Sequence, residues 1–270
     1  MPELPEVQTV ASTLANFIIG KRIKKIEIPY DKIIVGDAKE FAHRLEGQSI
    51  RGIDRVGKYL IFILDNDAFV SHLRMEGKYN IVDNDVPLGK HEHVAFIFED
   101  GTQLRYADTR KFGRMELVSK EGYKQELPLS KLGPEPWDAS VEDVYARLHR
   151  SSLPIKTLLL DQSIMTGIGN IYANEICFRM RINPKTPGNK LSKKRTAELI
   201  EISKEILNEA IAQGGTTIHS FAANGIDGLF QNKLQVHTQK ICPICGGEIT
   251  KEMVNGRGTY YCKKCQKRYS

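Results

Sequence analysis

The feature that most constrains the fold of this chain is a pair of Cys-X-X-Cys motifs near its C-terminal end. The motifs are Cys242-Pro-Ile-Cys245 and Cys262-Lys-Lys-Cys265, with 16 residues between them. Each motif makes a tight turn that directs two sulfurs toward one point, and this spacing is typical of a four-thiolate zinc site. We therefore predict that the four cysteines bind one structural zinc ion. Two disulfides are the alternative, which we disfavour because disulfides are typical of exported proteins and we find no export signal.

The spacer between the two motifs predicts a β-hairpin. Residues 248–254 and 259–261 have the composition of strands, and Asn255-Gly256-Arg257-Gly258 connects them. Asn-Gly is a strong turn signal because both residues tolerate a positive φ. We therefore expect Arg257 at an exposed hairpin tip.

Lysine and arginine are concentrated in this same segment. The chain of 270 residues has a formal net charge of +6, and residues 232–270 contain eight Lys or Arg against two Glu. These residues therefore account for the whole positive excess, and a compact basic module favours a polyanion such as nucleic acid as its partner. Part of the positive charge offsets the zinc site, because four thiolates with one zinc ion carry about two negative charges.

Hydrophobic periodicity predicts helices and strands for the rest of the chain. An amphipathic helix is expected over residues 3–18, and a short helix over 37–45. The expected strands are residues 22–28, 49–56, 59–64, 68–74, 94–98, 103–106 and 115–118. A segment rich in Pro and Gly at 121–138 is interpreted as a linker, and helices are expected beyond it at 141–149, 154–160, 168–180 and 191–213. This order predicts an α+β multidomain protein, with an antiparallel sandwich or barrel followed by a helical region.

No part of the sequence predicts a membrane span. Apolar runs such as residues 60–64 are far shorter than the about 20 apolar residues that a spanning helix needs. The N-terminus, Met1-Pro-Glu-Leu-Pro-Glu, does not have the pattern of a secretory signal. We therefore expect a cytoplasmic protein. Cys177 lies in an apolar helical stretch, and we interpret it as a small buried side chain rather than a nucleophile.

The N-terminus supports two interpretations. Proline at the first helical position, with Glu3 and Glu6 in the first turn, is a favourable helix start, because carboxylates interact well with the positive end of the helix dipole. Alternatively, removal of Met1 gives Pro2 a secondary amine that can attack a sugar carbon to form an iminium. Glu3 would then lie beside it as a proton donor or acceptor.

Several motifs, in order along the whole chain, resemble those of the bacterial formamidopyrimidine-DNA glycosylases, also called 8-oxoguanine DNA glycosylases. They are residues 1–7, Val56-Gly-Lys-Tyr-Leu60, His72-Leu-Arg-Met-Glu-Gly77, Asp108-Thr-Arg-Lys-Phe-Gly113, Leu132-Gly-Pro-Glu-Pro136, Gly167-Ile-Gly-Asn-Ile-Tyr172 and the two zinc motifs. The resemblance implies a bifunctional enzyme that excises oxidised purines from duplex DNA through an N-terminal proline Schiff base and cuts the backbone by β,δ-elimination. It also implies a bacterial monomer that acts at the nucleoid without a small-molecule cofactor or a membrane.

The family fold implied by the resemblance has an N-terminal antiparallel β-sandwich flanked by helices, a helical helix-two-turn-helix domain and a four-cysteine zinc finger. We assign residues 1–120 to the N-terminal catalytic domain, 121–138 to the linker, 139–231 to the helix-two-turn-helix domain and 232–270 to the zinc finger.

The resemblance also assigns roles to individual residues. The catalytic group is Pro2, Glu3, Lys58 and Arg257, and the lesion pocket includes Glu6 and Glu76. The remaining DNA-binding residues are His72, Met75, His91, Arg110, Phe112, Asn170 and His237.

Physical chemistry agrees with the residue types at these positions. A base inside a duplex must be extruded before an enzyme can reach it. By resemblance, Phe112 wedges between base pairs, Met75 fills the gap and Arg110 reads the orphaned cytosine. The resemblance assigns contacts with the DNA backbone to Lys58, His72, Asn170 and Arg257. The backbone amides of residues 167–170 lie just before an expected helix, where they could hold a phosphate; alternatively, the glycines there only permit a turn.

The sequence departs from the family before the zinc finger. A histidine, His237, stands where the family has a tyrosine that contacts a phosphate, and it lies five positions before Cys242 instead of seven. The segment near 216–230 corresponds to the family's lesion-capping loop, and its sequence supports no transfer of residue roles. His91 and His93 could also form a metal pair on one strand face, but we disfavour this because no further ligand is apparent.

Two other functions remain open. An endonuclease VIII-type glycosylase would act on oxidised pyrimidines with the same Pro-Glu start, although Leu4 and the set Met75, Arg110 and Phe112 argue against it. A non-enzymatic zinc-finger protein would bind damaged DNA without cutting it. Excision assays on the two lesion types, and borohydride trapping, would separate the three functions.

Overall fold

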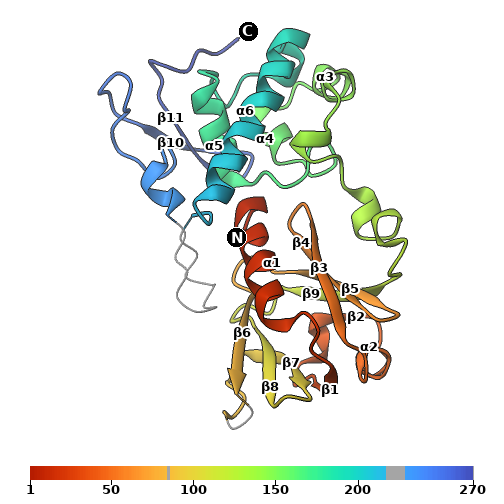
Figure 1. The fold of residues 1–270 in the computed structure, drawn as a ribbon. Helices are drawn as coiled ribbons and strands as arrows, with labels where there is room; N and C mark the ends of the chain where they lie inside the picture. Colours follow the sequence, from red (N-terminus) through yellow and green to blue (C-terminus); the bar gives the residue numbers. More distant parts are fainter. Residues whose placement is uncertain (84–85, 217–228, 270) are drawn as a thin grey trace. The chain divides into compact units, whose positions relative to one another are not determined.

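The computed structural model describes residues 1–83, 86–216 and 229–269, and contacts between residues divide them into two compact units (Figure 1). The N-terminal unit holds Met1–Ser130 together with Thr216. The C-terminal unit holds Lys131–Gly215 and the described residues from Leu229 onward. No helix among the described residues is long and apolar enough to cross a membrane.

The N-terminal unit is a β-sandwich, as predicted. One sheet has the strand order β2-β9-β5-β4-β3, and the other has the order β1-β7-β8-β6. The strands are β1 Ile23–Glu27, β2 Ile34–Val35, β3 Ile50–Val56, β4 Tyr59–Leu64, β5 Ala68–His72, β6 Lys78–Asp83, β7 Glu92–Phe98, β8 Thr102–Ala107 and β9 Arg114–Val118. Neighbouring strands are antiparallel, except that β2 runs parallel to β9.

Two of these strands were missed by the sequence prediction. Strand β2 has only two residues, which is too short to show any alternation of apolar and polar side chains. Strand β6 lies at the edge of its sheet, and most of its side chains are half-buried, so its pattern does not distinguish an inner from an outer face.

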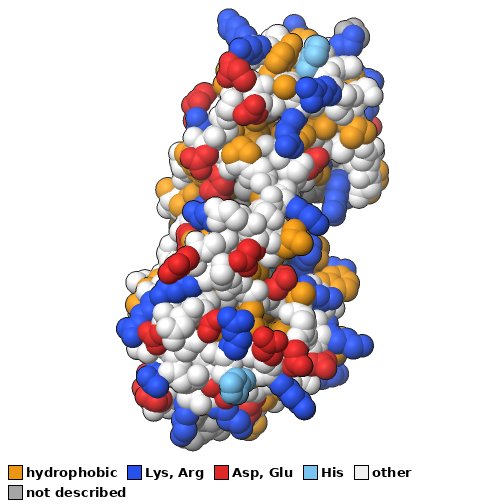
Figure 2. Space-filling model, turned by 90° about the vertical axis from the view of Figure 1, so that its right-hand side faces the viewer, with side chains coloured by type: hydrophobic (Ala, Val, Ile, Leu, Met, Phe, Trp, Pro, Cys, Tyr) orange, Lys and Arg blue, Asp and Glu red, His pale blue; other side chains and the backbone are white. Residues whose placement is uncertain are grey.

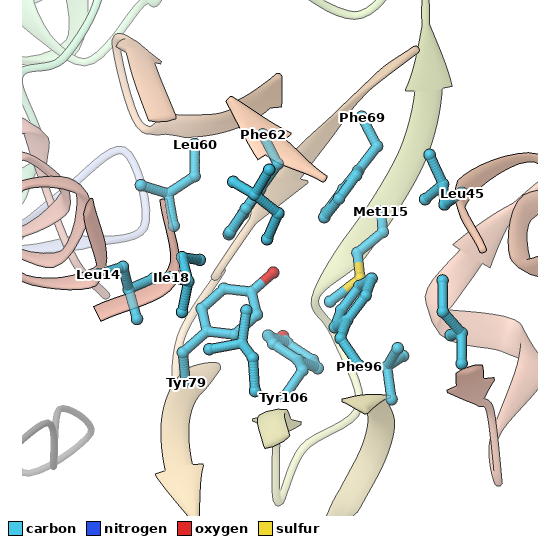
Figure 3. Packing of buried hydrophobic residues seen from close by; sticks show 14 of the residues in the cluster. Leu14, Ile18, Leu45, Leu60, Phe62, Phe69, Tyr79, Phe96, Tyr106 and Met115 are labelled. Atoms are coloured by element: carbon cyan, nitrogen blue, oxygen red, sulfur yellow. The ribbon is translucent and has the colours of Figure 1, made fainter. Parts of the chain in front are cut away.

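Aromatic side chains from both sheets fill the space between them (Figure 3). The ring of Phe69 on β5 stacks on Phe62 of β4 at 4.5 Å between centroids and on Phe96 of β7 at 5.4 Å. Tyr79 of β6 and Tyr106 of β8 lie in the same layer, with their rings 5.3 Å apart. Offset and edge-on aromatic pairs add to the free energy gained by burial, so this layer stabilises the packing of the two sheets.

Helix α1 (Leu4–Ile18) packs against β3 and β4, and α2 (Ala38–Leu45) packs against β1 and β2. The apolar residues Val7, Val10 and Leu14 of α1 repeat at helical spacing and are buried. This spacing places them on one face, which points into the core. The helix begins at Leu4 because Glu3 and Glu6 form a capping box.

The C-terminal unit consists of helices and one β-hairpin. The helices are α3 Val141–His149, α4 Ile155–Leu159, α5 Asn170–Arg179 and α6 Lys193–Ala212, and the hairpin strands are β10 Thr250–Val254 and β11 Arg257–Tyr261. Helix α5 packs against α4, α6 and β11, so it lies at the centre of this unit. As predicted, Cys177 of α5 is fully buried, and burial raises the pKa of its thiol to about 12.

The hairpin turn is tighter than the sequence predicted. Only Asn255 and Gly256 connect the strands, and both have positive φ values of 45° and 72°. Arg257 is therefore not at the tip itself, because it begins β11 and pairs with Val254. A two-residue turn with two positive φ values matches the twist of the strands and so replaces the longer expected connection.

The stacked core predicts a large effect for one truncation. Replacement of Phe69 by Ala should lower the free energy of unfolding by about 3 to 5 kcal/mol, because the rings on both sides lose their partner and a cavity remains. Phe17→Ala is the control, since Phe17 is 38% exposed and should cost roughly 1 kcal/mol or less. Urea unfolding followed by circular dichroism measures both. Equal effects of the two substitutions would contradict the prediction.

Candidate active site and nucleic-acid interface

Several of the predicted site residues gather at one end of the five-stranded sheet. Lys58 lies in the turn between β3 and β4, and His72, the last residue of β5, pairs with both Tyr59 and Arg114. The first turns of α1 reach the same end, because Arg55 of β3 donates from Nε to Oε1 of Gln8 at 2.8 Å. The sandwich therefore brings the start of α1 close to the β3–β4 turn and to the end of β5.

The residues at the start of α1 are buried and hydrogen-bonded. Pro2, Glu3 and Glu6 are all buried, with Glu3 2% and Glu6 3% exposed. In the capping box, the backbone N of Glu3 donates to Oε2 of Glu6 at 2.8 Å, and the Glu3 carboxylate accepts from the backbone N of Glu6. The other oxygen of Glu6 accepts from Thr216, through its backbone N at 2.9 Å and its Oγ1 at 3.1 Å. These hydrogen bonds fix Glu3 relative to the first turn of α1 and link that turn to Thr216.

His72 is held as a neutral hydrogen-bond donor. Burial is the main reason why the pKa of His72 is lowered to about 3, and the positive charges of Arg74 and Lys58 contribute to the same shift. Its Nδ1 accepts from the backbone N of Arg74 at 2.9 Å, and its ring contacts Tyr59 edge-on at 4.5 Å. Because Nδ1 is an acceptor, the single proton of the neutral ring is on Nε2. His72 can therefore donate from Nε2 to a phosphate without carrying a charge.

Lys58 is a buried cation at the same end of the sheet. Its residue is 5% exposed, and its charge contributes to the lowered pKa of His72. Gly57 beside it has a positive φ of 56°, which allows the tight turn between β3 and β4. A lysine in such a turn presents a positive charge close to the start of α1.

The loop from Asp108 to Gly113 is organised around one buried carboxylate. Asp108 is 1% exposed and accepts backbone hydrogen bonds from Arg110 at 3.0 Å, from Phe112 at 2.9 Å and from Gly113 at 2.8 Å. Such charge-assisted bonds are strong and fix the path of the loop. The side chains of Arg110 and Phe112 remain exposed, and the Arg110 guanidinium lies 4.7 Å from the centre of the Phe112 ring.

The turn that contains Met75 packs beside this loop. A Cβ added at Gly77 would lie 2.3 Å from the hydroxyl oxygen of Tyr106, and one added at Gly113 would lie 1.6 Å from the same atom. Both backbones therefore approach one buried hydroxyl group, which is possible only for glycine. Met75 is 39% and Phe112 48% exposed, and Glu76 is exposed in the same turn. The structure thus brings together two apolar side chains and a guanidinium that the sequence places 35 residues apart.

His91 and His93 do not share a strand face. His91 precedes β7 and is exposed, whereas His93 is buried and its Nε2 lies 2.8 Å from the backbone oxygen of Asp108. A bulge between Glu92 and Val94 breaks the alternation of the strand. The alternative interpretation as a metal pair is therefore wrong. His91 is an exposed side chain close to the loop 108–113, because the backbone N of Asp108 donates to the backbone oxygen of His91 at 2.9 Å.

In the C-terminal unit, Asn170 and the hairpin meet at Gly258. Asn170 is the first residue of α5, and its Nδ2 donates to the backbone oxygen of Gly258 at 3.1 Å. The buried ammonium of Lys156 on α4 donates to the same oxygen at 2.9 Å and to Oγ1 of Thr259 at 2.7 Å. These bonds fix the backbone beside the exposed Arg257, so they bring Asn170 and Arg257 to one place.

His237 is also placed by buried polar residues. The carboxylate of Glu175 accepts backbone hydrogen bonds from Gln235, Val236 and His237, although burial raises the pKa of that carboxyl. Nδ1 of His237 lies 2.7 Å from Nδ2 of Asn174, so Nδ1 accepts and Nε2 carries the proton. Burial lowers the pKa of His237 to about 4, which keeps the ring neutral. The histidine can therefore donate a hydrogen bond, as a tyrosine hydroxyl would.

The four cysteines of the two Cys-X-X-Cys motifs form one cluster. Their sulfurs all lie within 4.8 Å of one another, with 3.8 Å between Cys242 and Cys265 and 3.6 Å between Cys245 and Cys262. Zinc–sulfur bonds of about 2.3 Å in a tetrahedron require sulfurs about 3.8 Å apart. The cluster therefore fits one structural zinc ion, held by four thiolates. Among the residues in the described ranges it is the only such group.

Charges of both signs are interspersed on the face of the molecule drawn in Figure 2, and its hydrophobic side chains form small separate groups. Each unit therefore has its own candidate groups, at the end of the sandwich in the N-terminal unit and at the hairpin in the C-terminal unit.

Sequence reasoning missed the residues that hold these segments in place, namely Asp108, Lys156, Glu175 and Thr216. Asp108 begins a recognised motif, and Lys156 and Glu175 are charged residues inside apolar helical stretches. A charged residue in a buried helical pattern is unusual, and this signal could have identified Lys156 and Glu175. Thr216 carries no such signal.

Family models cover most of the chain. Residues 1–115 match the formamidopyrimidine-DNA glycosylase N-terminal domain, residues 132–222 match the formamidopyrimidine-DNA glycosylase H2TH domain, and residues 240–268 match a zinc finger found in FPG and IleRS. The order of the three matches agrees with the order of the sandwich, the helices and the four-cysteine cluster.

Whole-chain relatives carry the same family name. The chain is 47% identical over 272 residues to the formamidopyrimidine-DNA glycosylase of Lactobacillus helveticus, covering 98% of this chain and 99% of the relative. It is 47% identical over 275 residues to that of Bacillus licheniformis, covering 99% and 100%. Among solved structures, it is similar to wild-type Lactococcus lactis Fpg (MutM) in complex with DNA containing N7-benzyl-Fapy-dG, with a TM-score of 0.93, 40% identity and coverage of 99% and 100%.

The zinc cluster predicts a specific response to cysteine substitution. Cys262→Ser should release the metal and unfold the hairpin, because small modules of this kind draw most of their folding free energy from the metal. The N-terminal unit should stay folded. Metal analysis and circular dichroism test this, with Cys177→Ser as the control, because Cys177 lies outside the cluster. Full retention of zinc by Cys262→Ser would contradict the assignment.

The neutral His72 predicts acid sensitivity. Its folded pKa of about 3 lies below the unfolded value near 6.5, so between these values the unfolded state binds more protons. Stability is therefore lost as the pH falls below 6.5, by about 2 kcal/mol at pH 5. His72→Gln should remove this part of the pH dependence in urea unfolding, whereas substitution of the exposed His43 should not. Parallel stability curves for the parent and His72→Gln would refute the prediction.

Proposed function

The chain belongs to the formamidopyrimidine-DNA glycosylase family, and we propose that it is a DNA repair enzyme that excises oxidised purines, including 8-oxoguanine and formamidopyrimidines, from duplex DNA and then cuts the strand. The family match and the relatives' names support the substrate class. The observation that carries the proposal is the arrangement at one end of the five-stranded sheet, where the start of α1, Lys58 and His72 lie close together.

The nucleophile in this proposal is the amine of Pro2 after removal of Met1. The amine attacks the sugar carbon C1′, the bond to the base breaks, and the base leaves with a proton, so that an iminium joins Pro2 to the opened sugar. Loss of the 3′ and then the 5′ phosphate by β- and δ-elimination cuts the strand, and water releases the enzyme. Glu3 is beside the amine and carries protons in these steps.

Phosphate contacts come from groups on both units. His72 supports this role because its Nε2 is a fixed neutral donor, and Lys58 adds a positive charge at the same end of the sheet. Asn170 and Arg257 suit a second phosphate, since Gly258 and its partners bring their side chains together. His237 and the exposed His91 complete the set of backbone contacts that we propose.

The proposed wedge consists of Met75, Arg110 and Phe112. Two exposed apolar side chains can replace the stacking that an extruded base leaves behind. The planar guanidinium of Arg110 can donate paired hydrogen bonds to the cytosine opposite the lesion. Glu76, in the same turn as Met75, and Glu6 are assigned to the lesion pocket.

We propose that the domains are residues 1–120, the linker 121–138, residues 139–231 and the zinc finger 232–270, and that one chain acts alone. The zinc finger then contributes Arg257, and the sandwich contributes the chemistry.

An N-terminal block tests the proposed nucleophile. A tag that cannot be removed converts the Pro2 amine into an amide, which is not nucleophilic but disturbs the helix start little. Strand cutting of an 8-oxoguanine:C duplex and the borohydride-trapped adduct should both be lost almost completely. Affinity for an uncut abasic-site analogue and the melting temperature should change little.

The matched control is the same tag followed by a protease site, cleaved to leave Pro2 as the first residue. Cleavage should restore both activities. If a chain that mass spectrometry shows to be blocked still cuts at the parental rate, Pro2 is not the nucleophile. Excision of thymine glycol in preference to 8-oxoguanine would instead support the endonuclease VIII-type alternative.

A further inference from the structure

We infer that Thr216 is a positioning residue for the N-terminal nucleophile and that it acts through the carboxylate of Glu6. The inference rests on the proposed function, because it concerns the same site. Thr216 and Glu6 are separated by 210 residues in the sequence. In the fold, the backbone N and Oγ1 of Thr216 both donate to Oε1 of Glu6, at 2.9 Å and 3.1 Å.

The second oxygen of the same carboxylate contacts the N-terminal segment. Oε2 of Glu6 accepts from the backbone N of Glu3 at 2.8 Å, and the Glu3 carboxylate accepts from the backbone N of Glu6. Glu3, Glu6 and Thr216 are 2%, 3% and 7% exposed. A buried carboxylate is stable only when donors compensate for its lost hydration, so each of these hydrogen bonds constrains its orientation.

The Glu6 carboxylate is a rigid group, so a change in its contact with Thr216 also changes its contact with Glu3. Its two oxygens share one plane, so a rotation that follows the loss of a donor on Oε1 also moves Oε2 away from Glu3. Residues 1–3 precede α1, and Glu3 joins them to the helix through its hydrogen bonds with Glu6 and through its backbone oxygen, which accepts from the backbone N of Val7 at 3.0 Å. A displacement of about 1 Å at a reacting group can cost about 100-fold in rate. The Thr216 hydroxyl therefore contributes to the position of the Pro2 amine and the Glu3 carboxylate.

Thr9 provides a matched comparison on the same helix. Its Oγ1 donates to the backbone oxygen of Pro5 at 3.0 Å, an ordinary bond between a helical threonine and its own helix. Thr9→Val and Thr216→Val each remove one threonine hydroxyl. Only the second substitution removes a donor from Glu6.

The experiment compares Thr216→Val, Thr216→Ser, Thr9→Val and the parent, as full chains with Met1 removed. We measure the single-turnover rate of base excision from an 8-oxoguanine:C duplex, the affinity for an uncut abasic-site analogue and the melting temperature. Thr216→Val should lower the excision rate by roughly 10-fold, while its affinity stays within about 2-fold of the parent. Thr216→Ser keeps the hydroxyl and should restore most of the rate, and Thr9→Val should behave like the parent.

Coupling to Glu6 is tested by the double variant. If Thr216 acts through Glu6, then Glu6→Gln with Thr216→Val should excise no more slowly than Glu6→Gln alone. Rate losses that multiply would show that Thr216 acts by another route, and this would overturn the inference.

The other outcomes are equally decisive. A Thr216→Val chain that excises as fast as the parent overturns the inference but leaves the proposed function intact. A rate loss matched by an equal loss of affinity or by a large fall in melting temperature makes Thr216 a structural residue only. A parent chain that neither excises nor forms a trapped adduct removes the proposed function, and the positioning role with it.

Discussion

Three buried carboxylates, those of Glu6, Asp108 and Glu175, hold segments of this protein that lie outside its helices and strands. Backbone N–H groups in such segments have no partner in a sheet or helix, and an ionised carboxylate can accept several of them at once. Glu6 accepts from Glu3 and Thr216. Asp108 accepts from the backbone of Arg110, Phe112 and Gly113. Glu175 accepts from the backbone of Gln235, Val236 and His237. The exposed groups proposed to meet DNA therefore depend on acidic residues that are themselves hidden.

Two histidines are also fixed in position by hydrogen bonds, and neither of them carries a charge. Burial keeps His72 and His237 neutral, and a donor to Nδ1 leaves the proton of each ring on Nε2. Both are fixed dipoles, whereas Lys58 and Arg257 supply full positive charge. Both rings stay largely neutral in the folded protein between pH 5 and pH 8, because their pKa values lie below that range. The folding free energy is affected by pH instead, since unfolding exposes rings that can then take up protons.

The hairpin is fixed at two levels. Four cysteine sulfurs, 3.8 Å apart in the pair Cys242–Cys265 and 3.6 Å apart in the pair Cys245–Cys262, fit one zinc ion that would hold the two ends of the hairpin together. Lys156 and Asn170 then attach it to α4 and α5 through the backbone oxygen of Gly258. Burial of the Lys156 ammonium is costly, and its hydrogen bonds to Gly258 and Thr259 offset part of that cost. The metal alone would leave Arg257 on a folded hairpin with no defined position relative to Asn170.

Features with a local cause could be predicted from the sequence. Periodicity predicted α1, the four helices of the C-terminal unit and most strands, because each depends on neighbours within a few turns or along one strand. The zinc cluster was predictable because two tight turns and one hairpin bring its ligands together. Periodicity did not identify β2 or β6, the short turn before Arg257, or the different environments of His91 and His93.

Only the tertiary structure decided which distant polar groups meet. Thr216 and Glu6 are 210 residues apart, and Lys156 and Gly258 are 102 residues apart. Side-chain hydrogen bonds between remote segments leave no period in a sequence, because they depend on how sheets and helices stack rather than on local spacing. The sequence therefore determined the elements and the chemical groups of the site, whereas packing of the sandwich and of α5 determined their positions and their protonation.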